Sequence, residues 1–239
     1  MITLDGVTKR FGRRPALDGV SFTVEEGEVV GLVGPLGAGK STTMRVLATL
    51  LLPDRGRATV AGHPVATRPR EVRRAIGYLP DRPGTYARQT TREFLELCAG
   101  LHRVLAHHRA RLAEELLEVV GLAERADHET TAITASERRR LALAGCLVHD
   151  PAVLLLDEPL TGLDQPSQDE VLALVAELGG LGKTVLLTAR DADAVEAVCT
   201  STLHLGDLGG HHTGAARSRW PGGDAPPTGD EPAQTVPAP

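Results

Sequence analysis

The chain has 239 residues, of which 41% are hydrophobic and 24% charged, the composition of a globular protein long enough to bury a substantial core. Its longest apolar stretch, residues 141–148, is far shorter than the ~18 residues of a membrane-spanning helix, and its net charge of −5 disfavours nucleic acid as a partner. Three separated cysteines without C-x-x-C spacing disfavour disulfides and zinc, and no export signal is recognised at the N-terminus. We therefore expect a protein of the reducing cytosol.

The first sixty residues alternate β-rich runs with turn residues, which is typical of a sheet with one inserted helix. The strands are predicted at 2–7, 20–24, 29–33 and 58–61. Apolar residues recur at helical spacing from Met44 to Leu51, so a helix is expected to begin after Gly39 and to stop before Pro53. A strand, a tight glycine loop and a helix are thus predicted in that order.

The rest of the chain is predicted to be helical first and then alternating. Two helical patterns fill residues 90–121, which predicts an all-helical middle segment. Alternating helices and strands from 136 to 205 indicate a parallel sheet. The elements expected there are a helix to residue 149, strands at 153–156 and 185–187, and helices at 170–178 and 192–199. Glycine and proline are frequent after residue 206, so 207–239 is predicted to be a disordered tail.

A glycine-rich loop between the third strand and the first helix satisfies the pattern G-x-x-x-x-G-K-[ST]. Its residues are Gly34, Pro35, Leu36, Gly37, Ala38, Gly39, Lys40 and Ser41. The glycines allow backbone N–H groups to face phosphate oxygens, and the helix adds its positive N-terminal end. Lys40 is expected to reach the β and γ phosphates, and the Ser41 hydroxyl to ligate magnesium. The alternative, an ordinary glycine-rich turn, is disfavoured by the segment described next.

An apolar strand at 153–156 ends in two carboxylates, which supplies the second half of a nucleotide site. An acid at the end of a strand beside a phosphate loop can hold magnesium directly or through water, and Asp157 suits that role. Glu158 can polarise a water for attack on the γ-phosphate. The alternative is a buried strand capped by two acids that face solvent.

With these motifs the chain resembles the nucleotide-binding subunits of ABC transporters, especially the drug- and antibiotic-exporting type, over about residues 1–206. The resemblance rests on four segments: GPLGAGKST at 34–42, IGYLPD at 76–81, VLLLDEP at 153–159 and LTGLD at 160–164. It implies an α/β P-loop NTPase fold with a mainly parallel sheet, an antiparallel β layer at the N-terminus and an inserted helical subdomain at about 85–135.

The resemblance also implies further contacts to ATP. Phe11 matches the aromatic residue that stacks on adenine, Thr42 completes the phosphate loop, and Asp164 matches the D-loop aspartate. Asp81 occupies the Q-loop position, where a carboxylate can contact magnesium or its water. Alternatives remain for two of these residues, because Phe11 could be a core aromatic at a strand end and Asp164 a turn residue before a helix.

The signature segment departs from the family pattern Leu-Ser-Gly-Gly-Gln, because both glycines are absent. The aligned residues are Ile133, Thr134, Ala135, Ser136 and Glu137. The resemblance implies that Thr134 and Ser136 contact a nucleotide held by a partner subunit, although Cβ atoms at 135 and 136 would crowd a phosphate. The Glu137 carboxylate would also repel it unless the arginines at 138–140 compensate. Locally, Thr134 and Glu137 fit a capping box that begins a helix.

Other departures concern charge. The switch histidine of the family aligns with Arg190, which can neutralise γ-phosphate charge but cannot relay a proton, because a guanidinium does not deprotonate in proteins. The alternative is a solvated arginine paired with Asp191 or Asp193. Leu36 stands where the phosphate loop usually has Asn. The arginines at 138–140 are predicted to form a solvated helix face, with proximity to phosphate as the alternative.

The resemblance implies an ATP-binding and ATP-hydrolysing subunit of an ABC exporter, with ATP and Mg²⁺ as cofactors and Glu158 and Arg190 as catalytic residues. Its expected partners are a second nucleotide-binding subunit, identical or related, and a membrane permease, at the cytoplasmic face of a bacterial cell membrane; no nucleic acid is expected. One alternative is a degenerate regulatory subunit that binds nucleotide with little turnover. Another, a soluble ABC ATPase acting on ribosomes or DNA, is disfavoured by the single phosphate loop.

Overall fold

The computed structural model describes residues 1–84 and 88–206 together with one strand at 216–219. The elements in chain order are β1 (Ile2–Phe11), β2 (Arg14–Val24), β3 (Val29–Val33), α1 (Lys40–Leu47), β4 (Arg55–Val60), β5 (His63–Pro64), α2 (Pro69–Ala75), β6 (Ile76–Leu79), α3 (Thr91–Leu101), α4 (Ala106–Val119), the 3₁₀ turn η1 (Ala123–Arg125), α5 (Ala135–Leu147), β7 (Val153–Leu156), α6 (Gln165–Gly180), β8 (Thr184–Ala189), β9 (Ser201–His204) and β10 (Ala216–Arg219). Among these helices, none combines the length and the apolar character that crossing a membrane requires.

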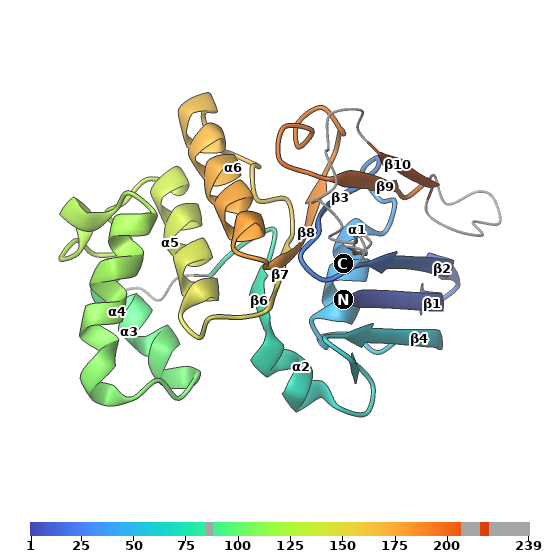
Figure 1. Cartoon of the computed structure of the whole chain (residues 1–239), viewed down its shortest axis with the longest axis horizontal. Helices are drawn as coiled ribbons and strands as arrows, with labels where there is room; N and C mark the ends of the chain where they lie inside the picture. Colours follow the sequence, from blue (N-terminus) through green and yellow to red (C-terminus); the bar gives the residue numbers. More distant parts are fainter. Residues whose placement is uncertain (85–87, 207–215, 220–239) are drawn as a thin grey trace, which may run out of the picture.

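Two sheets organise the molecule (Figure 1). The N-terminal sheet is antiparallel, with strand order β2-β1-β4-β5. The larger sheet has the order β10-β9-β3-β8-β7-β6, and every neighbouring pair in it is parallel except β10 with β9. This is the predicted α/β fold with a mainly parallel sheet and an antiparallel β layer. Helices α3, α4 and α5 lie together beyond the β6 edge of the larger sheet (Figure 1).

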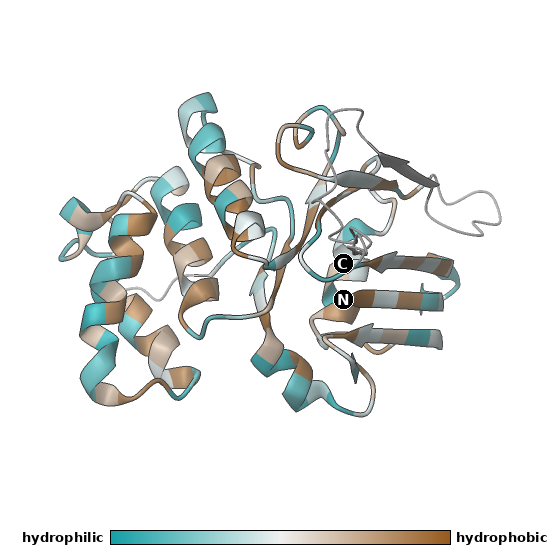
Figure 2. Ribbon diagram, viewed as in Figure 1, coloured by the Kyte–Doolittle hydropathy of each residue, from teal (hydrophilic) through white to brown (hydrophobic). Residues whose placement is uncertain are grey.

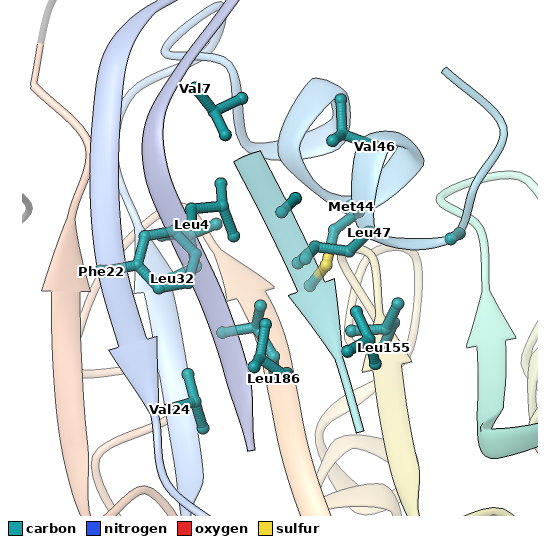
Figure 3. Packing of buried hydrophobic residues seen from close by; sticks show 14 of the residues in the cluster. Leu4, Val7, Phe22, Val24, Leu32, Met44, Val46, Leu47, Leu155 and Leu186 are labelled. Carbon is teal, nitrogen blue, oxygen red and sulfur yellow. The ribbon is translucent and has the colours of Figure 1, made fainter. Parts of the chain in front are cut away.

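Helix α1 joins the two sheets, because one core cluster includes residues of both sheets and of this helix. Met44 and Leu47 lie between Leu4 of β1 and the pair Leu155 and Leu186 of the parallel strands (Figure 3). All five side chains are buried. The helix that begins at the phosphate loop is therefore fixed on both sides by apolar packing.

Helix α5 is buried on two faces. Ala142, Leu143 and Cys146 belong to the cluster that packs on the parallel sheet, while Leu141 and Ala144 belong to the cluster formed with α3 and α4. Figure 2 shows the more usual amphipathic pattern on α4 and α6, where teal and brown patches alternate. Because it lies between the helical group and the sheet, α5 can contact the site at the strand ends.

Several predicted bounds are wrong in detail. Helix α1 ends at Leu47, short of Pro53, and α6 begins at Gln165 rather than at residue 170. The helix expected at 192–199 is a series of turns: the backbone N–H of Val195 donates to Ala192, and the N–H groups of Val198 and Cys199 donate to Val195. Helix α2 and strands β6 and β9 were not predicted as elements.

The cause of the error at 192–199 is tertiary packing. Val195 and Cys199 are buried, and a Cβ on Gly31 of β3 would lie only 3.0 Å from Val195 and 3.3 Å from Cys199. The apolar spacing in this segment reflects close packing against β3. The tail predicted from residue 207 lies outside the described residues, except for Ala216–Arg219, which form strand β10.

Candidate functional site

A cavity of about 200 Å³ lies where the phosphate loop meets the ends of β6, β7 and β8. It collects residues from five separate segments, which include part of the predicted site. The lining residues are Ala16, Leu36, Gly37, Ala38, Gly39, Lys40, Ser41, Thr42, Asp81, Glu158, Thr161 and Arg190. In an open parallel sheet, ligands bind outside the carboxyl ends of the strands, which is the position of this cavity.

The phosphate loop requires glycine where it turns into α1. Gly39 is the N-cap residue of α1 with φ of 100°, and a Cβ there would lie 2.5 Å from the carbonyl oxygen of Ala16. Only glycine tolerates both the left-handed backbone and this approach to β2. Leu36 projects from the loop with 91% of its surface exposed, so its replacement of Asn leaves the backbone of the loop undisturbed.

Lys40 is held inside the loop, with 5% of its surface exposed. Its Nζ donates hydrogen bonds to the carbonyl oxygens of Gly34 at 2.5 Å and Pro35 at 3.3 Å. The same ammonium lies 3.4 Å from Oε1 of Glu158. The cation therefore joins the phosphate loop to the end of β7 within the cavity.

Asp157, directly after β7, is fully buried and only half satisfied. Its Oδ1 accepts hydrogen bonds from the Ser41 hydroxyl at 3.1 Å and the Thr188 hydroxyl at 2.9 Å. Within the described residues its Oδ2 has no hydrogen-bond partner. Burial raises the pKa of this carboxyl above its ordinary value, and the bonds from Thr188 and Ser41 only partly offset the rise. An orphaned carboxylate oxygen beside a serine hydroxyl is a donor set that suits a hard cation.

Glu158 has a strained backbone that is fixed from both sides. Its φ is 52°, a left-handed conformation that costs a residue other than glycine about 1–3 kcal/mol. Its N–H donates to the Thr188 hydroxyl at 2.7 Å, and its carbonyl accepts from Arg139 at 2.8 Å. The side chain accepts from the Thr161 hydroxyl at 3.1 Å. These contacts aim the carboxylate at Lys40 and into the cavity.

Arg139 is a residue that sequence reasoning missed, since the arginines at 138–140 were predicted to face solvent. It is 8% exposed, and its guanidinium donates to the carbonyl oxygens of Glu158 and Asp81. Arg140 is also partly buried and bonds to Val120 and Glu170. Three successive positions on a helix span about 200°, and only the burial of α5 on two faces, which the sequence pattern does not reveal, turns Arg139 inward.

The signature segment satisfies its own polar groups. The Thr134 hydroxyl accepts from the N–H of Glu137 at 3.1 Å, and the Glu137 carboxylate accepts from the N–H of Thr134 at 2.7 Å, the predicted capping box. Glu137 also pairs with Arg125 at 3.0 Å. The pKa of Glu137 is lowered, first by the N–H of Thr134 and further by Arg125. The cation paired with the Glu137 carboxylate is thus Arg125, outside the run at 138–140.

Ser136 and Asp164 connect the starts of two helices. The Ser136 hydroxyl donates to the hydroxyl of Ser167 at 2.8 Å, and Asp164 is the N-cap residue of α6, accepting from the N–H of Ser167. The Ser167 side chain, and after it the N–H of Ser167, lowers the pKa of Asp164. Asp164 therefore occupies the turn position foreseen as its alternative, and neither Ser136 nor Thr134 lines the phosphate cavity.

The two remaining predicted residues lie at strand ends. Phe11 ends β1 with 52% of its surface exposed, so the alternative of a core aromatic is wrong; it lies outside the lining of the phosphate cavity. Arg190 follows β8, is exposed, and lines both this cavity and an adjoining one of about 290 Å³. Within the described residues it forms no ion pair with Asp191 or Asp193.

Residues 17–161 match the family model described as ABC transporter, which spans the phosphate loop and both carboxylates. The chain belongs to the ABC transporter family. Its relatives include the daunorubicin resistance ATP-binding protein DrrA3 of Streptomyces coeruleorubidus, 44% identical over 79% of the chain and 60% of that protein. The linearmycin resistance ATP-binding protein LnrL of Bacillus subtilis is 32% identical, over 83% of the chain and 64% of that protein. The chain spans less than two thirds of the length of these relatives.

Solved structures of the family have the same fold. A bacterial ABC transporter cassette, solved as a dimer, superposes with a TM-score of 0.81 at 25% identity, over 92% of the chain and 98% of the cassette. An ATP-binding subunit of an ABC transporter gives a TM-score of 0.80 at 26% identity, over 92% of the chain and 90% of that subunit. The fold of this chain is therefore that of an ABC ATPase cassette.

Proposed function

We propose that this chain binds ATP with Mg²⁺, hydrolyses it, and thereby drives export of drugs, antibiotics or other small molecules through a separate permease. The observation that carries the proposal is the meeting of Lys40 and Glu158 in one cavity at the phosphate loop, with Asp157 directly behind it and bonded to the cavity residue Ser41. Resistance and export ATP-binding proteins among the relatives support the transport role.

The phosphate loop supplies the binding contacts in this proposal. Residues 36–42 of the loop and of the start of α1 line the cavity that would take the β and γ phosphates, and backbone N–H groups of such a loop can bond them. Lys40 adds a point charge on these phosphates. Arg190, which also lines the cavity, neutralises charge that develops on the γ-phosphate. Phe11 at the end of β1 stacks on the adenine.

The residues present fit a magnesium ion. Asp157 offers a buried Oδ2 without a partner, and the Ser41 hydroxyl bonds to Oδ1 of the same carboxylate. Asp81 lines the same cavity and would contact the ion or one of its waters. When bound, magnesium would neutralise phosphate charge. Binding also gives the buried Asp157 carboxylate the partner that its Oδ2 lacks.

Glu158 is the general base of the proposed hydrolysis. A phosphate bound at Lys40 competes with the Glu158 carboxylate for the ammonium, which frees the carboxylate to orient a water. The water oxygen attacks the γ-phosphorus, its proton passes to Glu158, and the bond from the γ-phosphorus to the bridging oxygen breaks to leave ADP and phosphate. Thr161 holds the carboxylate in place through its hydroxyl.

We further propose that two such subunits assemble around ATP at the cytoplasmic face of the membrane, in contact with a permease. A dimeric cassette of the same fold supports the first part. In this assembly Thr134, Ser136 and Asp164 would contact the nucleotide on the partner subunit, which places the signature segment opposite the partner's phosphate loop. Whether the partner is a second copy or a related chain decides how much the altered signature matters.

The test is nucleotide binding and phosphate release by the purified chain and by Lys40→Ala. Loss of a charged hydrogen bond worth about 1.5–3 kcal/mol should weaken ATP binding roughly 10–100-fold in titration calorimetry. Lys183→Ala is the matched control, because Lys183 pairs with Asp150 at the surface and should leave affinity unchanged. Wild-type affinity in Lys40→Ala would refute the assigned site, and binding without phosphate release would favour a regulatory subunit.

A further inference from the structure

Arg139 links the two strand ends that carry the carboxylates of the site. Its Nη1 donates to the carbonyl oxygen of Glu158 at 2.8 Å, and its Nη2 donates to that of Asp81 at 2.7 Å. These residues follow β7 and β6, neighbouring parallel strands that pair Leu156 with Leu79. One planar guanidinium therefore sets the separation of the two carbonyl groups, since its nitrogens are held in a rigid fork.

The environment of Arg139 is unusual for a structural arginine. The residue is 8% exposed, and within the described residues its hydrogen bonds go to main-chain carbonyls while it forms no ion pair at contact distance. Burying a cation in this way is costly, and burial accordingly lowers the pKa of its guanidinium. The charges of Asp81, Glu158 and Asp157 oppose that effect, so all three carboxylates lie within electrostatic reach. The arginine thus faces the acidic side of the site.

Arg139 also connects the end of β7 to helix α5. Arg139 lies five positions after Thr134, the N-cap residue in the signature segment, so the guanidinium is anchored to the same rigid helix that the signature begins. Glu158 meanwhile adopts a φ of 52° that its own residue type disfavours. Thr188 holds the N–H of Glu158 and Arg139 holds its carbonyl, so the strained backbone depends on both.

We propose that Arg139 is a positioning residue for hydrolysis: it fixes the Glu158 and Asp81 backbones relative to α5. This inference rests on the proposed function of the same cavity. Arg139 is absent from the lining of the phosphate cavity, so it acts through these two backbones. The fork geometry is lost in both Arg139→Gln and Arg139→Lys, whereas the positive charge is kept in Arg139→Lys.

The experiment compares wild type, Arg139→Gln, Arg139→Lys and Arg140→Gln. Arg140 is the matched control, because it lies on the same helix and also donates to a backbone carbonyl, that of Val120, and neither residue lines the phosphate cavity. Each protein is first melted to show that it folds. Affinity for ADP is then measured with and without Mg²⁺, followed by kcat and KM for ATP.

In Arg139→Gln we expect ADP affinity without Mg²⁺ within ~3-fold of wild type. We expect kcat to be lowered ~10–100-fold, which corresponds to an activation barrier about 1.4–2.7 kcal/mol higher. KM for ATP should change less than kcat, and the gain in ADP affinity from Mg²⁺ should shrink, because the Asp81 backbone loses its anchor. Arg139→Lys should lower kcat in the same way, since it keeps the charge but lacks the fork. Arg140→Gln should match wild type in every readout.

Two results would overturn the inference: Arg139→Gln behaving like Arg140→Gln, or a fall in ADP affinity without Mg²⁺ as large as the fall in kcat. If Arg139→Gln does not fold, Arg139→Lys decides, since wild-type kcat in that variant refutes the fork. If wild type binds nucleotide but releases no phosphate, hydrolysis is refuted as the function, and the Mg²⁺-dependent gain still decides Arg139. If wild type binds no nucleotide, the proposed function and this inference both fall.

Discussion

The phosphate cavity and the signature segment differ in how their polar groups are satisfied. At the cavity, Asp157 behind Ser41 keeps one buried oxygen without a partner among the described residues, and the lining residue Arg190 forms no ion pair there with Asp191 or Asp193. In the signature segment, Thr134 and Glu137 cap each other and Glu137 pairs with Arg125. The cavity therefore holds polar groups that a ligand can still bond. The polar groups of the signature segment are already bonded within the chain.

This difference bears on which region can gain free energy by bonding a nucleotide. A polar group without a partner in the folded chain destabilises the fold and gains when a ligand arrives, whereas a capped helix start gains stability and loses free donors. Ser136 extends the contrast, because its hydroxyl is used by Ser167. Groups that can bond ATP thus remain free at the phosphate loop, whereas the signature segment keeps fewer free groups for a nucleotide on a partner subunit.

The largest effect is expected when the proposed general base, Glu158, is replaced. In Glu158→Gln the water-orienting carboxylate is lost while Lys40 and the phosphate loop remain, so ATP should still bind and phosphate release should fall ~100-fold or more. Lys40 loses a partner 3.4 Å away, which should favour its contact with phosphate. The measurement is phosphate release at saturating ATP, with affinity determined separately.

A matched control for this change is Glu177→Gln, which alters an exposed glutamate on α6. It should leave both turnover and affinity at the wild-type values. Unchanged turnover in Glu158→Gln would show that another group orients the water, and the cavity would then be a binding site alone.

The next largest effect is expected from substitutions in the signature segment. Restoring the family pattern with Ala135→Gly, Ser136→Gly and Glu137→Gln removes two Cβ atoms and one charge from the start of α5. Turnover should rise up to ~10-fold for each ~1.4 kcal/mol of partner contact recovered. The melting temperature should fall, because the Arg125 pair and the Ser167 hydrogen bond are lost. Phosphate release is followed against protein concentration, since the gain depends on dimer formation.

Arg190→His, added to the triple variant, tests whether a switch histidine raises the rate further. A wild type that already turns over as a dimer, unimproved by either change, would show that the signature works with its own residues. The self-satisfied start of α5 would then have no functional cost.

The cavity could be predicted because its motifs carry their own context. The pattern at 34–41 needs a strand before it and a helix after it, and both are present as β3 and α1. The two acids after 153–156 follow from the same logic, because a buried strand places its end at the sheet edge. The capping box at Thr134 was predictable for a similar reason: its hydrogen bonds join residues only three positions apart.

What could not be predicted depends on packing between distant segments. Arg139 reads as a surface residue in a run of three arginines, and only the position of α5 against β6 and β7 turns it inward. The turns at 192–199 carry helical apolar spacing because Val195 and Cys199 pack on β3. The pairing of Glu137 with Arg125 joins two segments whose approach is set by the helical cluster.

The smallest effect separates the two regions by the sign of a stability change. Asp157→Asn removes a buried charge whose pKa burial raises, so the variant should melt a few degrees above wild type at neutral pH, where ~1 kcal/mol corresponds to about 2–4 °C. Thr134→Ala removes a helix cap and should lower the melting temperature by a similar amount, for a loss of about 1 kcal/mol. Asp157→Asn thus removes a destabilising buried charge, whereas Thr134→Ala removes a stabilising helix cap.

The pH dependence identifies the cause. With a folded-state pKa above the unfolded one, the folded chain binds more protons between the two values, so wild-type stability falls as pH rises through that window. The advantage of Asp157→Asn should therefore be largest at neutral pH and vanish once the pH lies below the ordinary carboxyl range. The Thr134→Ala deficit should lack this particular dependence, and Mg²⁺ with ADP should reverse the order of Asp157→Asn and wild type. An equal or lower melting temperature for Asp157→Asn at neutral pH without ligand would mean that Ser41 and Thr188 already compensate the buried charge.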